Sequence, residues 1–202
     1  MNDLPRISQY NTREEMLSLV PKHGVYAEIG VFQGKFSDAI TTILQPKQLV
    51  LIDLFTGTMG SGDQDGNSFS YVNLDDVYTR LKEYSVRYPA LQVLKGDSVS
   101  SLATFENDSF DMVYIDGDHS YEGCKRDLEI SFEKVRNGGW IMGHDYEMNM
   151  NKAHTAYTFG VRQAVDEFCA TYRQSIIAKG MDGCVSYGIQ LTKVPKSVSL
   201  DF

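Results

Sequence analysis

The sequence predicts an α/β fold whose doubly wound sheet of about seven strands is mostly parallel and ends in an antiparallel C-terminal hairpin. Three observations support this prediction. Short apolar runs alternate with helix-like segments along most of the 202 residues, and a glycine-containing turn follows the first of these runs. Two strand-like runs near the C-terminus, 175–178 and 185–191, have no helix between them, so they should pair antiparallel. The length and the 42% hydrophobic content fit a single domain over residues 1–202.

The elements can be placed in order along the chain. The N-terminal segment 1–23 contains a predicted helix at 12–20, with Thr12 as its cap and Glu15 three residues later, and we expect it to form a lid or an edge. Strands are then expected at 24–29, 48–52, 91–94, 110–115 and 140–143, before the final hairpin. Helices are expected at 33–44, 74–88, 121–135 and 159–172; Pro46 ends the first of them, and Ser98 caps a further helix.

The glycine-rich stretch 55–70 interrupts this alternation. Long loops in compact domains are usually functional lids or flexible insertions, and both interpretations stay open here. If it is functional, we expect it to be a mobile loop that closes over bound ligands together with the N-terminal segment.

Composition and charge restrict the partners. The chain has 27 acidic and 19 basic residues and a formal net charge of −8, which disfavours a nucleic-acid groove or an anionic membrane surface and favours a small-molecule partner. The three cysteines are far apart and odd in number, as expected in a reducing, cytoplasmic compartment. Apolar runs stay well short of the about 18 residues that a membrane span needs. The sequence leaves a homo-oligomer open.

The stretch from strand 110–115 to strand 140–143 reads as a βαβ unit. A right-handed crossover makes its two strands parallel neighbours, so Asp116, Asp118 and His119 should lie at the same sheet edge as His144 and Asp145. Open α/β sheets bind their ligands at this edge. Carboxylates crowded in this way repel unless a cation or a shared proton relieves them, which favours a functional site.

The turn after the first strand, AEIGVFQG, opens a helix and indicates a cofactor site. A dinucleotide is the first alternative, but only Gly30 and Gly34 are present, and the third glycine of G-x-G-x-x-G is missing. Glu28 lies beside the turn, and Asp53 ends the next strand, where it is well placed for ribose hydroxyls. An acidic, glycine-turned pocket suits a cationic sulfonium ligand without phosphates.

These motifs resemble those of a known family. AEIGVFQG, LIDLF, GDS, YIDGDHSYEG and NGGWIMGHDY look like class I S-adenosylmethionine-dependent methyltransferases, which have a Rossmann-like fold. IDLFTG, the DGD-x-x-YE spacing and QAVDEF are similar, more narrowly, to the macrocin-type sugar O-methyltransferases. The resemblance covers roughly residues 24–170.

The resemblance implies roles for individual residues. The implied cofactor contacts are Glu28, Gly30, Phe32, Gly34, Asp53, Asp97, Ser98 and Asp116, with Asp53 on the ribose and Asp97 and Ser98 near adenine. Asp116 and Asp145 would bind a divalent metal, Mg²⁺ or another ion, and Asp118 would be the base. The sequence departs from the family at His144, where relatives commonly have a further metal-binding aspartate, and an imidazole disfavours magnesium.

The expected reaction is the methylation of a small-molecule hydroxyl. Methyl transfer from a sulfonium needs an aligned, electron-rich oxygen, so a metal must lower the hydroxyl's pKa, or a base must take its proton. Asp118, His119 and His144 are the base candidates, and His144 is also a candidate metal ligand. Two alternatives stay open: a non-catalytic S-adenosylmethionine-binding protein, which would not need the aspartates, and an NAD-dependent oxidoreductase.

Overall fold

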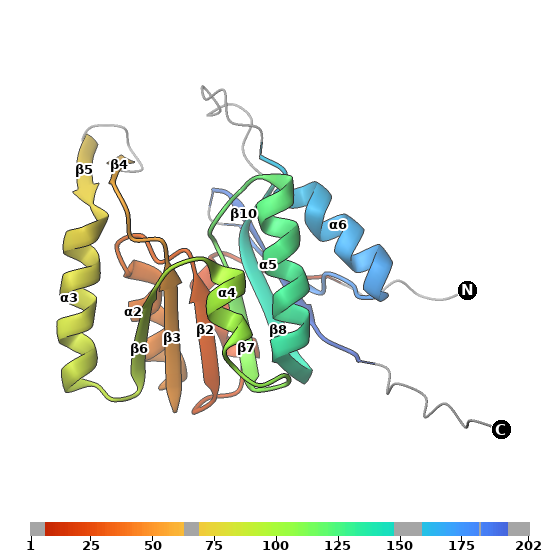
Figure 1. Ribbon diagram of the computed structural model, residues 1–202. Helices are drawn as coiled ribbons and strands as arrows, with labels where there is room; N and C mark the ends of the chain where they lie inside the picture. Colours follow the sequence, from red (N-terminus) through yellow and green to blue (C-terminus); the bar gives the residue numbers. More distant parts are fainter. Residues whose placement is uncertain (1–6, 63–68, 148–158, 182, 194–202) are drawn as a thin grey trace, which may run out of the picture.

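The computed structural model describes residues 7–62, 69–147, 159–181 and 183–193, and Figure 1 shows their arrangement. Eight strands form one sheet in the order β1-β9-β10-β8-β7-β2-β3-β6. In chain order they are β1 (Ser8–Tyr10), β2 (Val25–Ile29), β3 (Gln48–Asp53), β6 (Leu91–Lys95), β7 (Phe110–Ile115), β8 (Val135–Glu147), β9 (Ala178–Gly180) and β10 (Val185–Gln190).

The sheet confirms the predicted α/β class and its antiparallel ending. Neighbouring strands are parallel except at β10, which runs antiparallel to both β8 and β9. The seven predicted strands are all present, and β1 adds an eighth by pairing in parallel with β9 at the sheet edge. β7 and β8 are parallel neighbours, as the crossover argument predicts.

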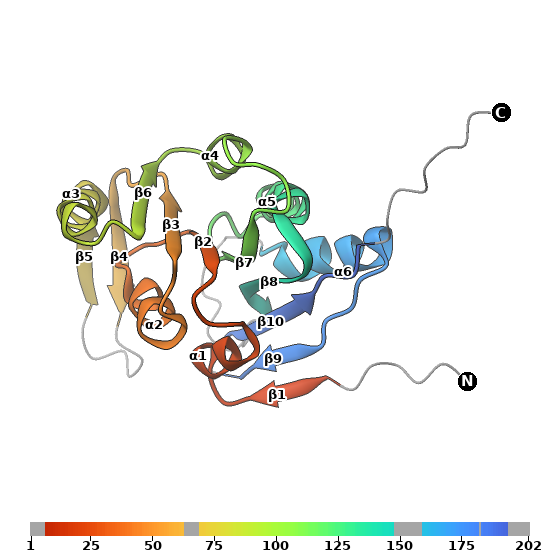
Figure 2. The same ribbon diagram turned by 90° about the horizontal axis from the view of Figure 1, so that it is seen from below.

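Helices cover both faces of the sheet (Figure 2). One hydrophobic cluster joins the sheet to α4 (Ser98–Ala103), α5 (Tyr121–Lys134) and α6 (Val161–Tyr172). The other joins it to α1 (Arg13–Met16), the 3₁₀ turn η1 (Leu17–Leu19), α2 (Lys35–Leu44) and α3 (Leu74–Arg87). Central strands therefore read as continuous apolar runs, because successive side chains enter opposite clusters: in β3, Val50 and Ile52 enter the first, Leu49 and Leu51 the second. None of the helices in the described ranges is both long and apolar enough to cross a bilayer.

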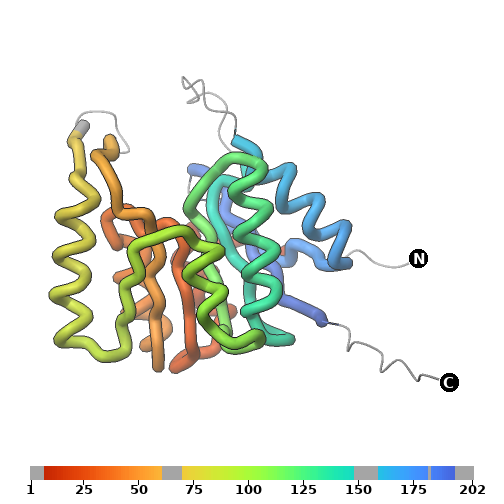
Figure 3. The backbone as a smooth tube through the Cα atoms, in the orientation of Figure 1, coloured from red at the N-terminus to blue at the C-terminus, as the bar shows by residue number. Residues whose placement is uncertain are grey.

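The expected loop at 55–70 is largely a hairpin instead. β4 (Thr58–Gly62) and β5 (Phe69–Asn73) pair antiparallel as a separate two-stranded sheet, and residues 63–68 lie outside the described ranges. The two strands of this hairpin satisfy each other's backbone hydrogen bonds. Their glycines have low β propensity, so the sequence does not indicate the strands. The hairpin leads directly into α3, at the opposite end of the molecule from α6 (Figure 3).

Three further boundaries differ from the prediction. Asp97, and not Ser98, caps α4, because Asp97 keeps an extended backbone and its carboxylate accepts from Ser100 N. β9 begins at Ala178 instead of 175, although Ile177 N already donates to Gly188 O. β8 extends beyond 140–143 in both directions because β7 and β10 supply pairing partners along its length.

Candidate functional site

A cavity of about 460 Å³ opens at the carboxyl ends of β2, β3 and β7. The strand order reverses between β2 and β7, so the cavity lies at the topological switch point of the sheet. Six of the predicted cofactor residues line it: Gly30, Phe32, Asp53, Asp97, Ser98 and Asp116. Most of the residues that the sequence predicts for the cofactor therefore meet at one cavity, although they come from four different segments.

Gly30 allows the ends of β2 and β7 to approach each other closely. Its φ is +81°, and a Cβ at this position would lie 2.0 Å from the backbone oxygen of Asp116. Asp116 N also donates to Ile29 O at 2.8 Å. Glycine is therefore required here by both the backbone conformation and the space available.

Asp53 binds the turns on either side of the cavity. Its Oδ2 accepts from Val31 N at 2.8 Å and Phe32 N at 3.1 Å, and its Oδ1 accepts from Phe55 N at 2.8 Å. Phe32 and Phe55 both have positive φ, at 48° and 44°, conformations that L residues seldom adopt. The carboxylate thus holds two strained turns while it lines the cavity.

Two predicted cofactor residues, Glu28 and Gly34, are not among the residues that line the cavity. Glu28 is 1% exposed and accepts a 2.5 Å hydrogen bond from Ser37 Oγ on α2. Burial raises the pKa of Glu28 to about 8, against the opposing effect of the Ser37 hydrogen bond. Gly34 precedes α2 with φ +82°, so a glycine is favoured there by the left-handed backbone of the turn and not by contact with the cavity.

Asp127 is a cavity residue that the sequence did not single out. It lies on α5, is 3% exposed, and accepts a hydrogen bond from Ser98 Oγ. Burial raises the pKa of Asp127 to about 6. The pKa of Asp97 shifts in the opposite direction, because its hydrogen bonds to Ser100 lower it. Asp127 lies on the buried face of α5 with Cys124 and Leu128, so an acidic residue at a core-facing helix position is the sequence signal that could have indicated its role.

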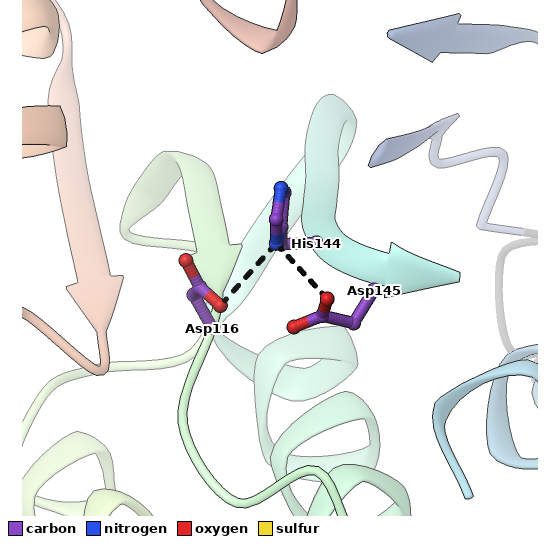
Figure 4. Close-up of side chains that lie close together, drawn as sticks. All are labelled: Asp116, His144 and Asp145. Atoms are coloured by element: carbon purple, nitrogen blue, oxygen red, sulfur yellow. Dashed lines mark ion pairs between the residues drawn. The ribbon is translucent and has the colours of Figure 1, made fainter. Parts of the chain in front are cut away.

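Asp116, His144 and Asp145 form a cluster, which we call the acidic cluster, at the ends of β7 and β8 (Figure 4). One ligand atom from each residue lies within 4.8 Å of the others. His144 Nδ1 is 3.3 Å from Asp145 Oδ1 and 3.8 Å from Asp116 Oδ1. Asp145 has φ +58° within the long strand β8 and is 8% exposed. These are the three residues predicted to bind a metal.

His119 also lies close to the two carboxylates of the acidic cluster. Its Nε2 is buried and lies 3.2 Å from Asp145 Oδ2 and 3.5 Å from Asp116 Oδ1, without a well-directed hydrogen bond to either. Its ring stacks on Phe159 with 4.9 Å between centroids. The imidazole nitrogen of His144 and the two carboxylates, without His119, form the donor set that fits a divalent cation.

Charge also couples these four side chains. Burial lowers the pKa of His119 and of His144, but the neighbouring aspartates outweigh it, so each pKa is raised above its ordinary value. For Asp145, burial raises the pKa, but the two histidines outweigh burial and the net shift is downward. The carboxylate of Asp145 thus stays ionised and attracts positive charge.

Asp118 lies apart from the acidic cluster's contacts. It is exposed, lines the cavity, and accepts from Ser120 N at 2.9 Å, which turns the loop into α5. A Cβ on Gly123 would lie 2.3 Å from the Asp118 carboxyl carbon, so the absence of a side chain at Gly123 leaves the space that this carboxyl occupies.

Arg13 reaches the acidic cluster from the N-terminal segment, a contact that sequence reasoning missed. Its Nη1 donates to Asp116 Oδ2 at 3.0 Å across 103 positions of the chain. Since α1 has four residues and its cap is local, the pairing of β1 with β9 and the packing of α1 on β9 bring this side chain to the site.

Comparison with known proteins agrees with this geometry. A family model described as "Methyltransferase domain" matches residues 27–146, from β2 to the end of the acidic cluster. "Uncharacterized protein R132" of Acanthamoeba polyphaga mimivirus is 25% identical over 122 residues, which cover 60% of this chain and 51% of that protein. The chain thus spans about half the length of this curated relative.

Solved structures show the same fold at low sequence identity. N-methyltransferase NodS from Bradyrhizobium japonicum WM9 has a TM-score of 0.61 at 12% identity, covering 90% of this chain and 95% of that one. A second NodS structure, with S-adenosyl-L-homocysteine, has the same score and identity and covers 90% and 86%. The ribosomal protein L11 methylase from Lactobacillus delbrueckii subsp. bulgaricus has a TM-score of 0.57 at 15% identity, covering 91% and 79%. The chain therefore belongs to the methyltransferase-domain family, with the fold of class I S-adenosylmethionine-dependent methyltransferases.

Proposed function

We propose that this methyltransferase transfers the methyl group of S-adenosylmethionine to a hydroxyl oxygen of a small molecule of sugar or natural-product type, with a divalent cation held by Asp116, His144 and Asp145. One observation carries the proposal: the acidic cluster lies at the edge of the cavity, and Asp116 belongs to both. A non-catalytic S-adenosylmethionine-binding protein would need the cavity but not these converging donors.

The cavity suits the sulfonium donor. Acidic side chains at its wall favour a cation, and Asp53 has one carboxylate lone-pair site left for a ribose hydroxyl after its three backbone hydrogen bonds. NodS, which has the same fold, was solved with S-adenosyl-L-homocysteine. Its demethylated cofactor supports placing the donor in this cavity.

The reaction needs an aligned oxygen and an acceptor for its proton. The methyl carbon forms its bond to the hydroxyl oxygen as the C–S bond breaks, the electron pair stays on sulfur, and the proton passes to a base. When bound, the cation would lower the hydroxyl's pKa. Asp116 lies at the border between the cavity and the acidic cluster. It would therefore help to align the methyl group of S-adenosylmethionine with the hydroxyl oxygen of the acceptor.

Among the three base candidates, the contacts favour His119. It lines the cavity and lies 3.2 and 3.5 Å from the two cluster carboxylates, which would stabilise its protonated form. Asp118 also lines the cavity, but its carboxylate is engaged with Ser120 N. His144 points Nδ1 between Asp116 and Asp145, a position that suits a ligand better than a base. Imidazole moves the metal preference from magnesium toward manganese or zinc.

Further features of the chain support a small acceptor and a cytoplasmic location. The net charge of −8 is unfavourable for nucleic acid. In the part of the chain that the structure describes, Cys124, Cys169 and Cys184 form no disulfide, as is common in a reducing compartment.

The test combines metal removal with an acceptor screen. Purified protein, S-adenosylmethionine and a panel of small molecules that carry either hydroxyl or amine groups are assayed for methyl transfer before and after chelation, and after Mn²⁺, Zn²⁺ or Mg²⁺ is restored. Transfer should stop on chelation and return best with Mn²⁺ or Zn²⁺. Full transfer in the presence of chelator would exclude the metal role, and transfer to amines alone would exclude the hydroxyl acceptor.

A matched pair of variants identifies the site. Asp145→Asn removes one charged ligand and should reduce metal affinity about tenfold or more. Asp108→Asn is the control, because both aspartates have φ +58°, which asparagine tolerates, and Asp108 pairs with Lys193 at the surface. Equal metal content in the two variants would contradict the assignment.

A further inference from the structure

Arg13 divides the two oxygens of Asp116 between two neighbours. Its Nη1 donates to Oδ2 at 3.0 Å, and both side chains are 21% exposed. The other oxygen, Oδ1, lies 3.5 Å from His119 Nε2 and 3.8 Å from His144 Nδ1. The guanidinium therefore occupies one oxygen and leaves the other turned toward the acidic cluster.

The side chain of Arg13 is held by an aromatic surface. Its guanidinium carbon lies 4.7 Å from the centroid of the Phe36 ring, and that ring packs against Tyr114 at 4.0 Å between centroids. Phe36 and Tyr114 are 4% and 1% exposed, so neither ring can move far. A planar guanidinium stacks on such a ring in a way that a lysine ammonium cannot.

The backbone of Arg13 is fixed as well. A Cβ on Gly180 of β9 would lie 3.0 Å from Arg13 N and 2.9 Å from Met16 Sδ, so α1 packs directly on the strand. Thr12 Oγ1 accepts from Glu15 N at 3.2 Å, and Glu15 in turn accepts from Asn11 N at 2.8 Å. The direction from which Arg13 approaches Asp116 is thus set by both its main chain and its side chain.

We infer that Arg13 is a positioning residue: by holding Oδ2 it presents Oδ1 of Asp116 as a single-oxygen ligand to the divalent cation, an inference that rests on the proposed function. Groups that hydrogen-bond to a metal-binding carboxylate fix its orientation, and their loss typically costs about 10- to 100-fold in metal affinity. The charge of Arg13 also offsets part of the repulsion between Asp116 and Asp145. The N-terminal segment is then part of the site.

The test measures Mn²⁺ affinity by electron paramagnetic resonance titration of the full chain, without acceptor. Arg13→Lys keeps the charge but loses the planar fork and the ring stacking, and it should bind Mn²⁺ about tenfold more weakly or worse. Arg136→Lys is the matched control: this arginine also pairs with an aspartate, Asp111, at 2.5 Å, but at the opposite end of β7 and β8. It should bind Mn²⁺ like the wild type.

A second variant separates positioning from simple support of the fold. Arg13→Ala should also bind Mn²⁺ weakly, and millimolar guanidinium chloride should restore part of the affinity, whereas sodium chloride at equal ionic strength should not. Calorimetric affinity for S-adenosylmethionine should stay at the wild-type value in all these variants, because Arg13 does not line the cavity. A joint loss of S-adenosylmethionine and Mn²⁺ binding would mark a structural role and overturn the inference.

The other possible results of the Mn²⁺ titrations also test the inference. Wild-type or tighter Mn²⁺ binding by Arg13→Lys and Arg13→Ala would overturn the inference alone, since Arg13 would then be irrelevant to the cation or compete with it. A wild-type protein that binds no Mn²⁺ would overturn it together with the metal part of the proposed function.

Discussion

Replacing Asp53 should weaken both the fold and the binding of S-adenosylmethionine. The carboxylate accepts hydrogen bonds from Val31 N, Phe32 N and Phe55 N, and two of these three residues have positive φ. Asp53→Ala removes all three acceptors at once. Asp53→Asn keeps one oxygen, which can still serve Val31 and Phe32 while its amide faces Phe55.

The magnitude follows from these contacts. A hydrogen bond to a charged group contributes about 1.5–3 kcal/mol net, and the half-buried cavity wall lets water replace part of it, so we assign about 1 kcal/mol to each bond. Asp53→Ala should therefore lower the free energy of unfolding by about 3 kcal/mol, and Asp53→Asn by about 1 kcal/mol. Asp97→Ala calibrates the scale, because it removes one helix-cap hydrogen bond to Ser100 N and should cost about 1 kcal/mol.

Urea unfolding of the variants measures the stability, and calorimetry measures the affinity for S-adenosylmethionine. If Asp53 also holds the ribose, its loss should weaken binding by a further 1 kcal/mol or more, about fivefold or greater. An Asp53→Ala protein with wild-type unfolding free energy and weakened binding would show that the carboxylate serves the cofactor alone. Wild-type affinity in a stable Asp53→Asn protein would remove the ribose contact instead.

Two other substitutions test the close approach of Gly30 to the Asp116 backbone and the burial of the Glu28 carboxyl. Gly30→Ala should lower the free energy of unfolding by about 3 kcal/mol or more, because its Cβ would meet the Asp116 carbonyl. The control Gly138→Ala, with φ +78° and open space around it, should lower it by about 1–2 kcal/mol in the same urea titrations. Equal losses in the two variants would refute the steric argument. The pKa of Glu28, raised to about 8, means that its stabilising effect is complete below the unfolded value of 4.5 and is lost as pH rises toward 8, by up to about 1.4 kcal/mol per pH unit. Glu28→Gln has no proton to lose, so its unfolding free energy should decline less over this range than that of the wild type, and parallel profiles would contradict the prediction.

The parallel core of the fold could be predicted because its signals are local. Strand β7 ends where Ile115 gives way to Asp116, and its residues 112–115 are all apolar because both faces are buried there. Strand β4 had no such signal: the run from Thr58 to Gly62 is polar and rich in glycine, and its pairing with β5 exists only in the folded chain.

The residues of the candidate site also divide into those that local sequence patterns predict and those that they do not. Asp116 and Asp145 follow recognisable strands, so the crossover rule alone is enough to bring them together. Arg13 belongs to a four-residue helix, and its contact depends on the edge pairing of a three-residue strand, which no local pattern indicates. The contacts of Asp53 with the two turns could not be predicted for another reason, because these turns are defined by positive φ angles at Phe32 and Phe55.

The pairing of β1 with β9 also sets an order of events during synthesis. Ser8 pairs with Ala178, so β1 cannot join the sheet until the chain has been synthesised as far as β9. The part of the sheet that carries Gly30 and Asp53 is complete by then, since β2, β3, β6 and β7 need nothing beyond Ile115 to pair with one another. In a growing chain, the strands that line the cavity can therefore pair before the β1–β9 pairing that accompanies the guanidinium beside Asp116.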